Sequence, residues 1–233
     1  MLQLVLFSGL AGAMIPLGGW LARQENIRSD WLRTDFRHAV IAFGGGALLS
    51  AVVFVLIPEG QEHLGPLAVI GWIAAGAVVM SLIDRQLERS GSSRAQLVAM
   101  LADFIPEALA LGAVFANGGS TAVLLALMIG LQNLPEGFNA YREQLQTGAT
   151  GHTILRRFVL LGLIGPAAAL AGYFLLAGWP ELTATIMLAA AGAILYLVFQ
   201  DIAPEAKVKN RFGPALGAVA GFLLGLGGHL LIG

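Results

Sequence analysis

The sequence predicts an all-α polytopic membrane protein of eight transmembrane helices, in a single domain that covers residues 1–233. Hydrophobic residues make up 57% of the chain and charged residues only 12%, whereas a soluble domain carries roughly 25% charged residues. Apolar stretches long enough to cross a bilayer recur along the chain. All 13 lysines and arginines lie in alternate connections between these stretches.

The eight spans follow from the thickness of a bilayer. A hydrocarbon core of ~30 Å requires about 20 apolar residues of helix, so we divide the chain at its charged and turn-rich segments. In chain order the predicted spans are Met1–Leu21, Phe36–Pro58, Pro66–Ile83, Ala95–Ala116, Thr121–Tyr141, Phe158–Gly178, Leu182–Gln200 and Pro214–Ile232. The connections between them are too short to hold a separate soluble domain.

The first span has a second interpretation, as a cleaved secretory signal. Ala11-Gly12-Ala13 resembles a small-residue cleavage site, but the segment lacks the basic start of such a signal. Removal of this segment would also weaken the pattern in which lysines and arginines lie only in alternate connections between spans. We therefore retain it as a membrane helix.

The basic residues predict the orientation, because lysine and arginine near the ends of spans are retained on the cytoplasmic side. They fall only in the first, third, fifth and seventh connections: Arg23, Arg28, Arg33 and Arg37; Arg85, Arg89 and Arg94; Arg142, Arg156 and Arg157; Lys207, Lys209 and Arg211. Both termini are therefore expected outside. The expected location is a bacterial cytoplasmic (inner) membrane.

Glycine is abundant, at 31 residues, and many glycines lie inside the apolar spans, as in Gly44-Gly45-Gly46. Small residues let membrane helices approach closely where no hydrophobic force drives them together. Close helix packing is the favoured interpretation. Sliding of one helix group against another is left open.

Ionisable and amide side chains concentrate in spans four and five. Asp103 precedes Glu107 by four residues, and Gln132 precedes Glu136 by four, so each pair lies on one face of its helix. Asn133 stands beside Gln132. An ionisable residue at mid-bilayer costs at least ~2.5 kcal/mol, which marks these residues as functional candidates.

Each of these spans also contains a proline directly before its glutamate. Pro106 and Pro135 cannot donate hydrogen bonds to the carbonyls of Ala102 and Leu131. A carbonyl released at membrane depth must be satisfied by a water or an ion. Several acids so close together would raise one another's pKa values unless a cation enters. The sequence therefore predicts an oxygen-rich site for a divalent cation.

Other interpretations stay open beside this one. The polar groups could be hydrogen-bonded to each other and hold the helices together in a non-transporting membrane scaffold. Paired carboxylates could also serve as acid and base in an intramembrane enzyme. However, no His-Glu-x-x-His element, serine nucleophile motif or glycine-rich phosphate loop occurs. The expectation is that the protein is not an enzyme and holds no prosthetic group.

The sequence resembles the ZIP (Zrt/Irt-like protein) family of divalent-metal transporters across all eight spans. The most specific element is residues 132–137, followed by Pro106-Glu107; Ile57-Pro58-Glu59-Gly60 and Ala203-Pro204-Glu205 add weaker support. The resemblance implies inverted repeats, spans one to three and six to eight, around the central pair of spans four and five. It also implies uptake into the cytoplasm by alternating access.

Carried over by position, the resemblance implies a primary metal site made by Asp103, Glu107, Gln132 and Glu136, with Asn133 at an adjoining second site. Two stretches depart from the family pattern. Asp103-Phe104 stands where the family has His-Asn, and Gly165-Pro166 stands where members often show Glu-Pro. These changes remove ligands of the second site, so one principal ion is predicted.

The expected cargo is a divalent metal ion of the zinc, iron or manganese class, and cadmium could share the path. The predicted ligands are all oxygens, which suit manganese, magnesium or calcium, whereas the family implies zinc, iron or manganese. The remaining partner is the lipid bilayer. A net charge of −1 gives no basic face for nucleic acid, and a homodimer is one assembly open to such a bundle.

Overall fold

The computed structural model describes residues 1–24, 36–90, 95–116, 118, 121–206 and 212–232. Within these helices the side chains of residues 87–88, 90, 95–99, 102–103 and 232 are not described. The described residues form helices and short turns with no strand among them. The elements are α1 (Leu2–Gln24), α2 (Arg37–Ala51), η2 (Val52–Leu56), α3 (Ile57–Gln61), α4 (Pro66–Ser90), α5 (Ala95–Ala116), α6 (Thr121–Gln146), α7 (Gly151–Gly162), α8 (Ile164–Leu175), α9 (Pro180–Leu197), η3 (Val198–Ile202), α10 (Ala203–Ala206) and α11 (Gly213–Ile232).

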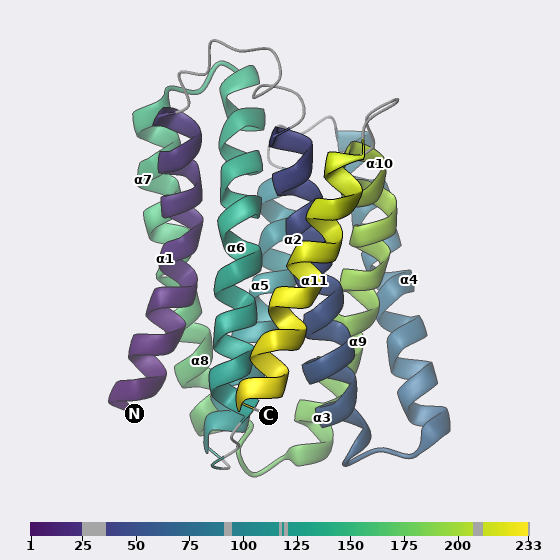
Figure 1. Cartoon of the computed structure of the whole chain (residues 1–233). Coiled ribbons are helices and arrows are strands. Elements are labelled where there is room, and N and C mark those ends of the chain that lie inside the picture. The colour runs from purple at the N-terminus through teal and green to yellow at the C-terminus, as the bar shows by residue number, and fades with distance from the viewer. Residues whose placement is uncertain (25–35, 91–94, 117, 119–120, 207–211, 233) are drawn as a thin grey trace.

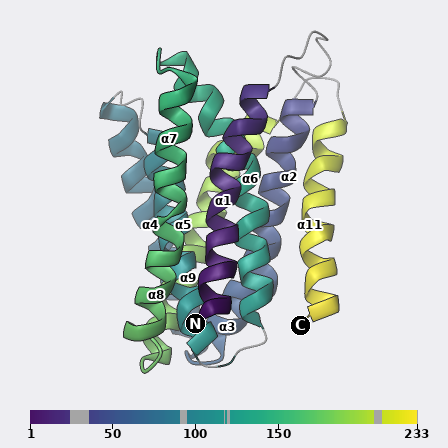
Figure 2. The same ribbon diagram turned by 90° about the vertical axis from the view of Figure 1, so that its left-hand side faces the viewer.

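The helices run up and down in one bundle, with both chain ends at the same end of it (Figures 1 and 2). Helix α6 stands in the middle, packed against α1 on one side and α2 on the other (Figure 1). Every basic residue that the structure describes lies near the opposite end of the bundle from the termini: Arg23, Arg37, Arg85, Arg89, Arg142, Arg156 and Arg157. We call this the basic end. The remaining basic residues of the predicted charge map lie outside the described residues.

Within the described residues, seven helical segments are long and apolar enough to cross a membrane, which makes the chain a multi-pass membrane protein. The predicted fourth span corresponds to α5, a helix of 22 residues whose fully described apolar part is Phe104–Ala116. The count of eight spans therefore stays a prediction. Helix α6 extends to Gln146, beyond the predicted end at Tyr141, because its charged last turns continue the helix past the apolar stretch.

Prolines shape three of the spans. In spans two and seven a π-helical segment, η2 or η3, comes just before Pro58 or Pro204. A proline cannot donate to the carbonyl four residues earlier, and a wider π turn accommodates the lost bond. Span six breaks at Leu163, between α7 and α8, where Pro166 leaves the carbonyl of Gly162 without its usual donor. By contrast, α5 and α6 continue as α-helices through Pro106 and Pro135.

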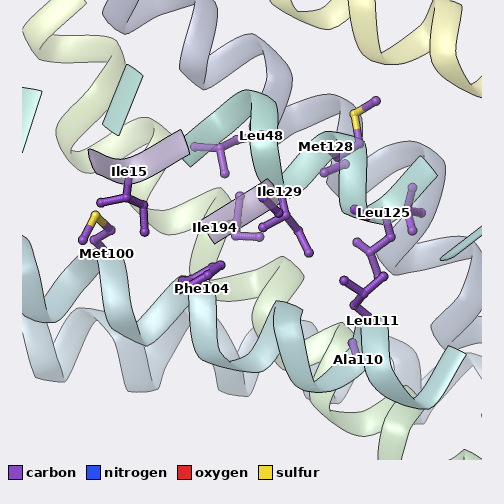
Figure 3. Packing of buried hydrophobic residues seen from close by; sticks show 14 of the residues in the cluster. Ile15, Leu48, Met100, Phe104, Ala110, Leu111, Leu125, Met128, Ile129 and Ile194 are labelled. Carbon is purple, nitrogen blue, oxygen red and sulfur yellow. The ribbon is translucent and has the colours of Figure 1, made fainter. Parts of the chain in front are cut away.

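A large apolar core surrounds α6. Figure 3 shows Leu125, Met128 and Ile129 of α6 among buried side chains of neighbouring helices: Ile15 of α1, Leu48 of α2, Phe104 and Leu111 of α5, and Ile194 of α9. Lipid-facing positions carry large exposed apolar side chains, such as Leu67 and Leu231. The core fixes α6 from all sides and so places its polar residues inside the bundle.

Reciprocal glycines hold five pairs of the described helices together. In each pair a glycine of one helix lies against the backbone of the other, and a partner glycine does the same in return; the pairs are Gly12 with Gly162 (α1/α7), Gly18 with Gly137 (α1/α6), Gly46 with Gly221 (α2/α11), Gly76 with Gly192 (α4/α9) and Gly112 with Gly172 (α5/α8). A Cβ at any of these positions would overlap a carbonyl oxygen of the facing helix. At these positions the glycines therefore allow close helix packing, which is the favoured interpretation of the glycine content.

These contacts, with that of Gly165 against Ser8 of α1, join α1, α5, α6, α7 and α8 into one group. They join α2 to α11 and α4 to α9 as two separate pairs. Every described glycine that touches the backbone of another helix does so within its own group or pair. Under the predicted inverted repeat, the packed pair α1/α6 corresponds to the packed pair α8/α5, and α2/α11 corresponds to α9/α4. The inverted repeat itself stays a prediction.

Candidate functional site

Glu107 of α5 and Gln132 of α6 meet inside the bundle. Glu107 is completely buried and Gln132 is 1% exposed. The Nε2 amide of Gln132 donates a hydrogen bond to Oε2 of Glu107, so the two central helices are joined through their polar side chains. The Oε1 atom of Gln132 has no hydrogen-bond partner among the described residues. A buried carboxylate beside an unsatisfied carbonyl oxygen favours a bound proton or cation.

Asn133 points away from this pair. Its Nδ2 donates to the backbone carbonyl of Ala11 in α1, at 3.0 Å. Its Oδ1 is buried and lacks a hydrogen-bond partner within the described part of the chain. Consecutive residues of a helix point about 100° apart, so Gln132 and Asn133 face different neighbours. The sequence placed the two amides beside each other, but only Gln132 contacts Glu107.

Glu136 lies one turn further along α6 and lines a cavity of about 100 Å³. The cavity is bounded by α2, α5, α6 and α9, and it extends toward the basic end. Its other polar lining residues are Asn139, Asp201 and Glu205. Glu136 is half-buried, and among the polar lining residues it is the one nearest to Gln132 along α6.

An ion pair stands at the basic end of the cavity. Arg37, the first residue of α2, donates from Nη2 to Oε1 of Glu205 at 2.7 Å. The two side chains are 22% and 34% exposed, so the pair lies between the interior and the surface. Asp201, one helical turn before Glu205, is exposed. The cavity therefore reaches toward water at its basic end.

The side chain of Asp103, a predicted ligand, lies outside the described residues. Its backbone is part of α5, one turn before Glu107. Among the residues that the structure describes, no three or more histidine, aspartate or glutamate side chains come close enough to hold a metal ion. The full ligand set of Asp103, Glu107, Gln132 and Glu136 therefore stays a prediction.

The two stretches that depart from the family pattern touch each other. Phe104 is 2% exposed, and its ring lies against Gly165 of α8. A Cβ at position 165 would come within 2.5 Å of Cζ of Phe104 and 3.2 Å of the carbonyl oxygen of Ser8. The ring thus fills the space that a side chain at position 165 would need.

This contact predicts that substitutions at the two positions are coupled. Gly165→Ala should lower the free energy of unfolding by about 1–3 kcal/mol, because the buried ring must move. In a Phe104→Leu background the same change should cost much less, so the coupling energy should reach about 1 kcal/mol. Thermal unfolding of the four purified proteins in detergent measures both quantities. Equal costs of Gly165→Ala in the two backgrounds would contradict the contact.

Part of the polar lining was not predicted from the sequence. Asn139, at the cavity, was not singled out, although it follows Glu136 by three residues and so shares its helix face. Asp201 precedes Glu205 by four residues in the same way. Of these two acids, only Glu205 was singled out from the sequence, because it belongs to a Pro-Glu motif. A spacing of three residues from Glu136, or of four residues from Glu205, was the signal that could have identified Asn139 and Asp201.

Comparison with known proteins gives one informative similarity. No family model matches the chain. The chain is 26% identical over 192 residues to an Arabidopsis thaliana protein named "Putative zinc transporter", an alignment that covers 76% of this chain and 31% of the relative. The chain therefore spans about a third of that relative's length. The similarity, together with seven apolar helices, supports a multi-pass membrane protein that resembles a metal transporter.

Proposed function

We propose that this protein carries divalent metal ions across the membrane along a path between α5 and α6. The single observation that carries the proposal is Glu107, a completely buried carboxylate that accepts a hydrogen bond from Gln132 across the two helices. An ionised carboxylate inside a membrane bundle is costly unless a positive charge joins it. The neighbouring amide oxygen of Gln132 offers that cation a second ligand.

The proposed site contains Asp103, Glu107, Gln132 and Glu136, and Asn133, whose Nδ2 bonds to Ala11, is proposed at an adjoining second site. These oxygen ligands suit a hard divalent ion such as manganese, and the similarity to a protein named as a zinc transporter adds zinc to the candidates. One principal ion is proposed. In support, the ring of Phe104 and the absence of a side chain at Gly165 leave an apolar contact where the family pattern would place two further ligands.

The proposed direction is into the cytoplasm, from the end with the termini toward the basic end. Basic residues favour the cytoplasmic side, and the cavity beside Glu136 extends toward that side. Alternating access is supported by the glycine contacts, because they join α1, α5, α6, α7 and α8 into one group and, among the described residues, none of them reaches the backbone of α2, α4, α9 or α11 from that group. A boundary of side chains can slide more easily than interlocked backbones.

The test is metal uptake by the purified protein in lipid vesicles, with manganese, zinc, iron, cadmium and magnesium offered in turn. Vesicles with the protein should accumulate at least one of the first four faster than empty vesicles. Asp103→His should raise the zinc-to-manganese ratio about tenfold, because imidazole favours zinc over manganese.

Two outcomes would count against the proposal. Uptake equal to that of empty vesicles for every metal would favour a scaffold or an enzyme. An unchanged zinc-to-manganese ratio in Asp103→His would remove Asp103 from the ligand set while leaving transport itself intact. The control is Asp84→His, because Asp84 accepts a hydrogen bond from Tyr196 between α4 and α9 and lies outside the proposed path.

A further inference from the structure

A hydrogen bond joins α3 to α6 at the end of the bundle where both termini lie, which we call the terminal end (Figure 1). Oγ1 of Thr121, the first residue of α6, donates to Oε1 of Glu59 in the first turn of α3. Both side chains are half-buried. A hydrogen bond to a carboxylate is stronger than one between neutral groups, and partial burial reduces competition from water. The contact can therefore hold the two helices together.

The two helices belong to different parts of the bundle. Helix α6 is joined to α1 by reciprocal glycines. Helix α3 packs on α9 instead, since Gly60 lies against Leu188, and a Cβ at position 60 would come within 2.5 Å of Cγ of that leucine. Helix α9 is joined in turn to α4 by reciprocal glycines. The Thr121–Glu59 bond therefore links the group that contains α6 to the α4/α9 pair.

Apolar side chains fill the face of α6 between this bond and Gln132. Thr121, Leu125, Met128 and Gln132 fall within about 60° of one another around the helix, so they share one face. Gln132 lies about 16 Å beyond Thr121 along the helix axis. Leu125 is completely buried and Met128 is 2% exposed, and both belong to the apolar core (Figure 3). This face of α6 is therefore closed to water between the terminal end and Gln132.

The other side of Gln132 differs. There the cavity of about 100 Å³ beside Glu136 extends toward the basic end. A carrier that works by alternating access must pass through a second arrangement, in which the basic end is closed and the terminal end is open. Because Glu59 and Thr121 bridge α3 and α6 at the terminal end, their bond has to break for these helices to separate there.

We propose that the Thr121–Glu59 bond is a latch that holds the terminal end closed while the cavity is open toward the basic end. The inference rests on the proposed function, and it gives a positioning role to two residues outside the α5/α6 site. When the latch breaks, α3 moves away from α6, and water and the cation reach Leu125 and then Gln132. When the latch forms again, the apolar face of α6 is covered.

The first test measures access to Leu125, and it uses the absence of cysteine from the chain. The rate at which N-ethylmaleimide alkylates a Leu125→Cys protein is measured on the purified full chain in detergent. Adding Thr121→Val, which removes the hydroxyl and keeps the shape, should raise this rate about tenfold, as expected for loss of one hydrogen bond to a charged group. Thr121→Ser keeps a hydroxyl and should leave the rate within twofold.

The matched control for this test is Thr183→Val, also at the terminal end. The hydroxyl of Thr183 donates to the carbonyl of Trp179 at 3.2 Å, so its bond stays within one segment of the chain and joins no two helices. The control should leave the alkylation rate of the Leu125→Cys protein within twofold.

The second test prevents the latch from opening. A Glu59→Cys, Thr121→Cys protein in lipid vesicles is cross-linked with a short bis-methanethiosulfonate, and dithiothreitol, removed before the assay, reverses the link. Cross-linking should slow manganese uptake at least tenfold, and reduction should restore it, because α3 can separate from α6 again. The matched pair is Asp84→Cys, Tyr196→Cys, since these side chains share a hydrogen bond of 2.8 Å between α4 and α9, which pack through reciprocal glycines. Its uptake should stay within twofold after cross-linking.

Either of two results overturns the inference: Thr121→Val and Thr121→Ser proteins that are alkylated at the same rate, or a cross-linked Glu59→Cys, Thr121→Cys protein that takes up manganese as fast as its reduced form. Both leave the proposed function standing whenever the unsubstituted protein takes up metal in vesicles. Failure of uptake by the unsubstituted protein would instead overturn the proposed function. The alkylation rates need no transport, so they still decide whether the bond closes the terminal end.

Discussion

Glu107→Gln should abolish metal uptake while leaving the protein folded. Glutamine has the shape of a protonated glutamate, so it can keep a hydrogen bond with Gln132 and fill the same buried space. It cannot supply the negative charge that replaces the hydration shell of a divalent ion. We expect the uptake rate in vesicles to fall about a hundredfold, which corresponds to about 3 kcal/mol of lost ion stabilisation.

This substitution distinguishes an ion ligand from a structural hydrogen bond. If Glu107 were a protonated acid that only joins α5 to α6, glutamine would replace it with little effect and uptake would stay within twofold of the unsubstituted protein. Glu181→Gln is the matched control, because Glu181 is an exposed acid in the first turn of α9, at the end of the bundle where the termini lie. Its uptake should equal that of the unsubstituted protein.

Gly76→Ala should destabilise the fold more than any other single-methyl change in α4 for which the structure describes the surroundings. A Cβ at position 76 would lie 2.7 Å from the carbonyl carbon of Ala189 and 2.8 Å from its Cα, so the backbones of α4 and α9 must separate. We expect a loss of about 1–3 kcal/mol in the free energy of unfolding. The double variant Gly76→Ala, Gly192→Ala should cost more, because the two glycines face each other's helix.

The same helix supplies the control. Gly71→Ala adds a methyl group where nothing lies within 4 Å. Alanine is a better helix former than glycine by roughly 0.5–1 kcal/mol, so this variant should be as stable as the unsubstituted protein or slightly more stable. Thermal unfolding in detergent compares the two. A Gly76→Ala protein as stable as Gly71→Ala would show that α4 and α9 do not pack through their glycines.

Much of the fold could be predicted because bilayer crossing imposes a simple pattern on the sequence. Apolar length placed the helices, and the alternation of basic residues predicted that both termini lie at one end of the bundle, as Figure 1 shows. Details that depend on tertiary contacts could not be predicted in the same way. The π-helical segments before Pro58 and Pro204 and the break at Leu163 depend on how each helix absorbs its proline.

The site was predictable in part for a similar reason. Residue spacing marked Glu107 and Gln132 as candidate ligands, and the structure places the two side chains in contact. Spacing along one helix does not reveal which neighbouring helix a side chain meets. The bond of Asn133 to α1, instead of a contact with α5, could therefore not be predicted. The contact of Phe104 with Gly165 and the cavity that joins Glu136 to α9 both require the packing of helices far apart in the chain.

The most direct test of the account is to locate the ion. Crystals of the protein grown with manganese should give an anomalous difference peak between α5 and α6, with a Glu107 carboxylate oxygen and the Gln132 amide oxygen at metal–oxygen distances of about 2.0–2.6 Å. Manganese peaks confined to surface carboxylates, with Glu107 and Gln132 still bonded to each other and no ion beside them, would contradict it.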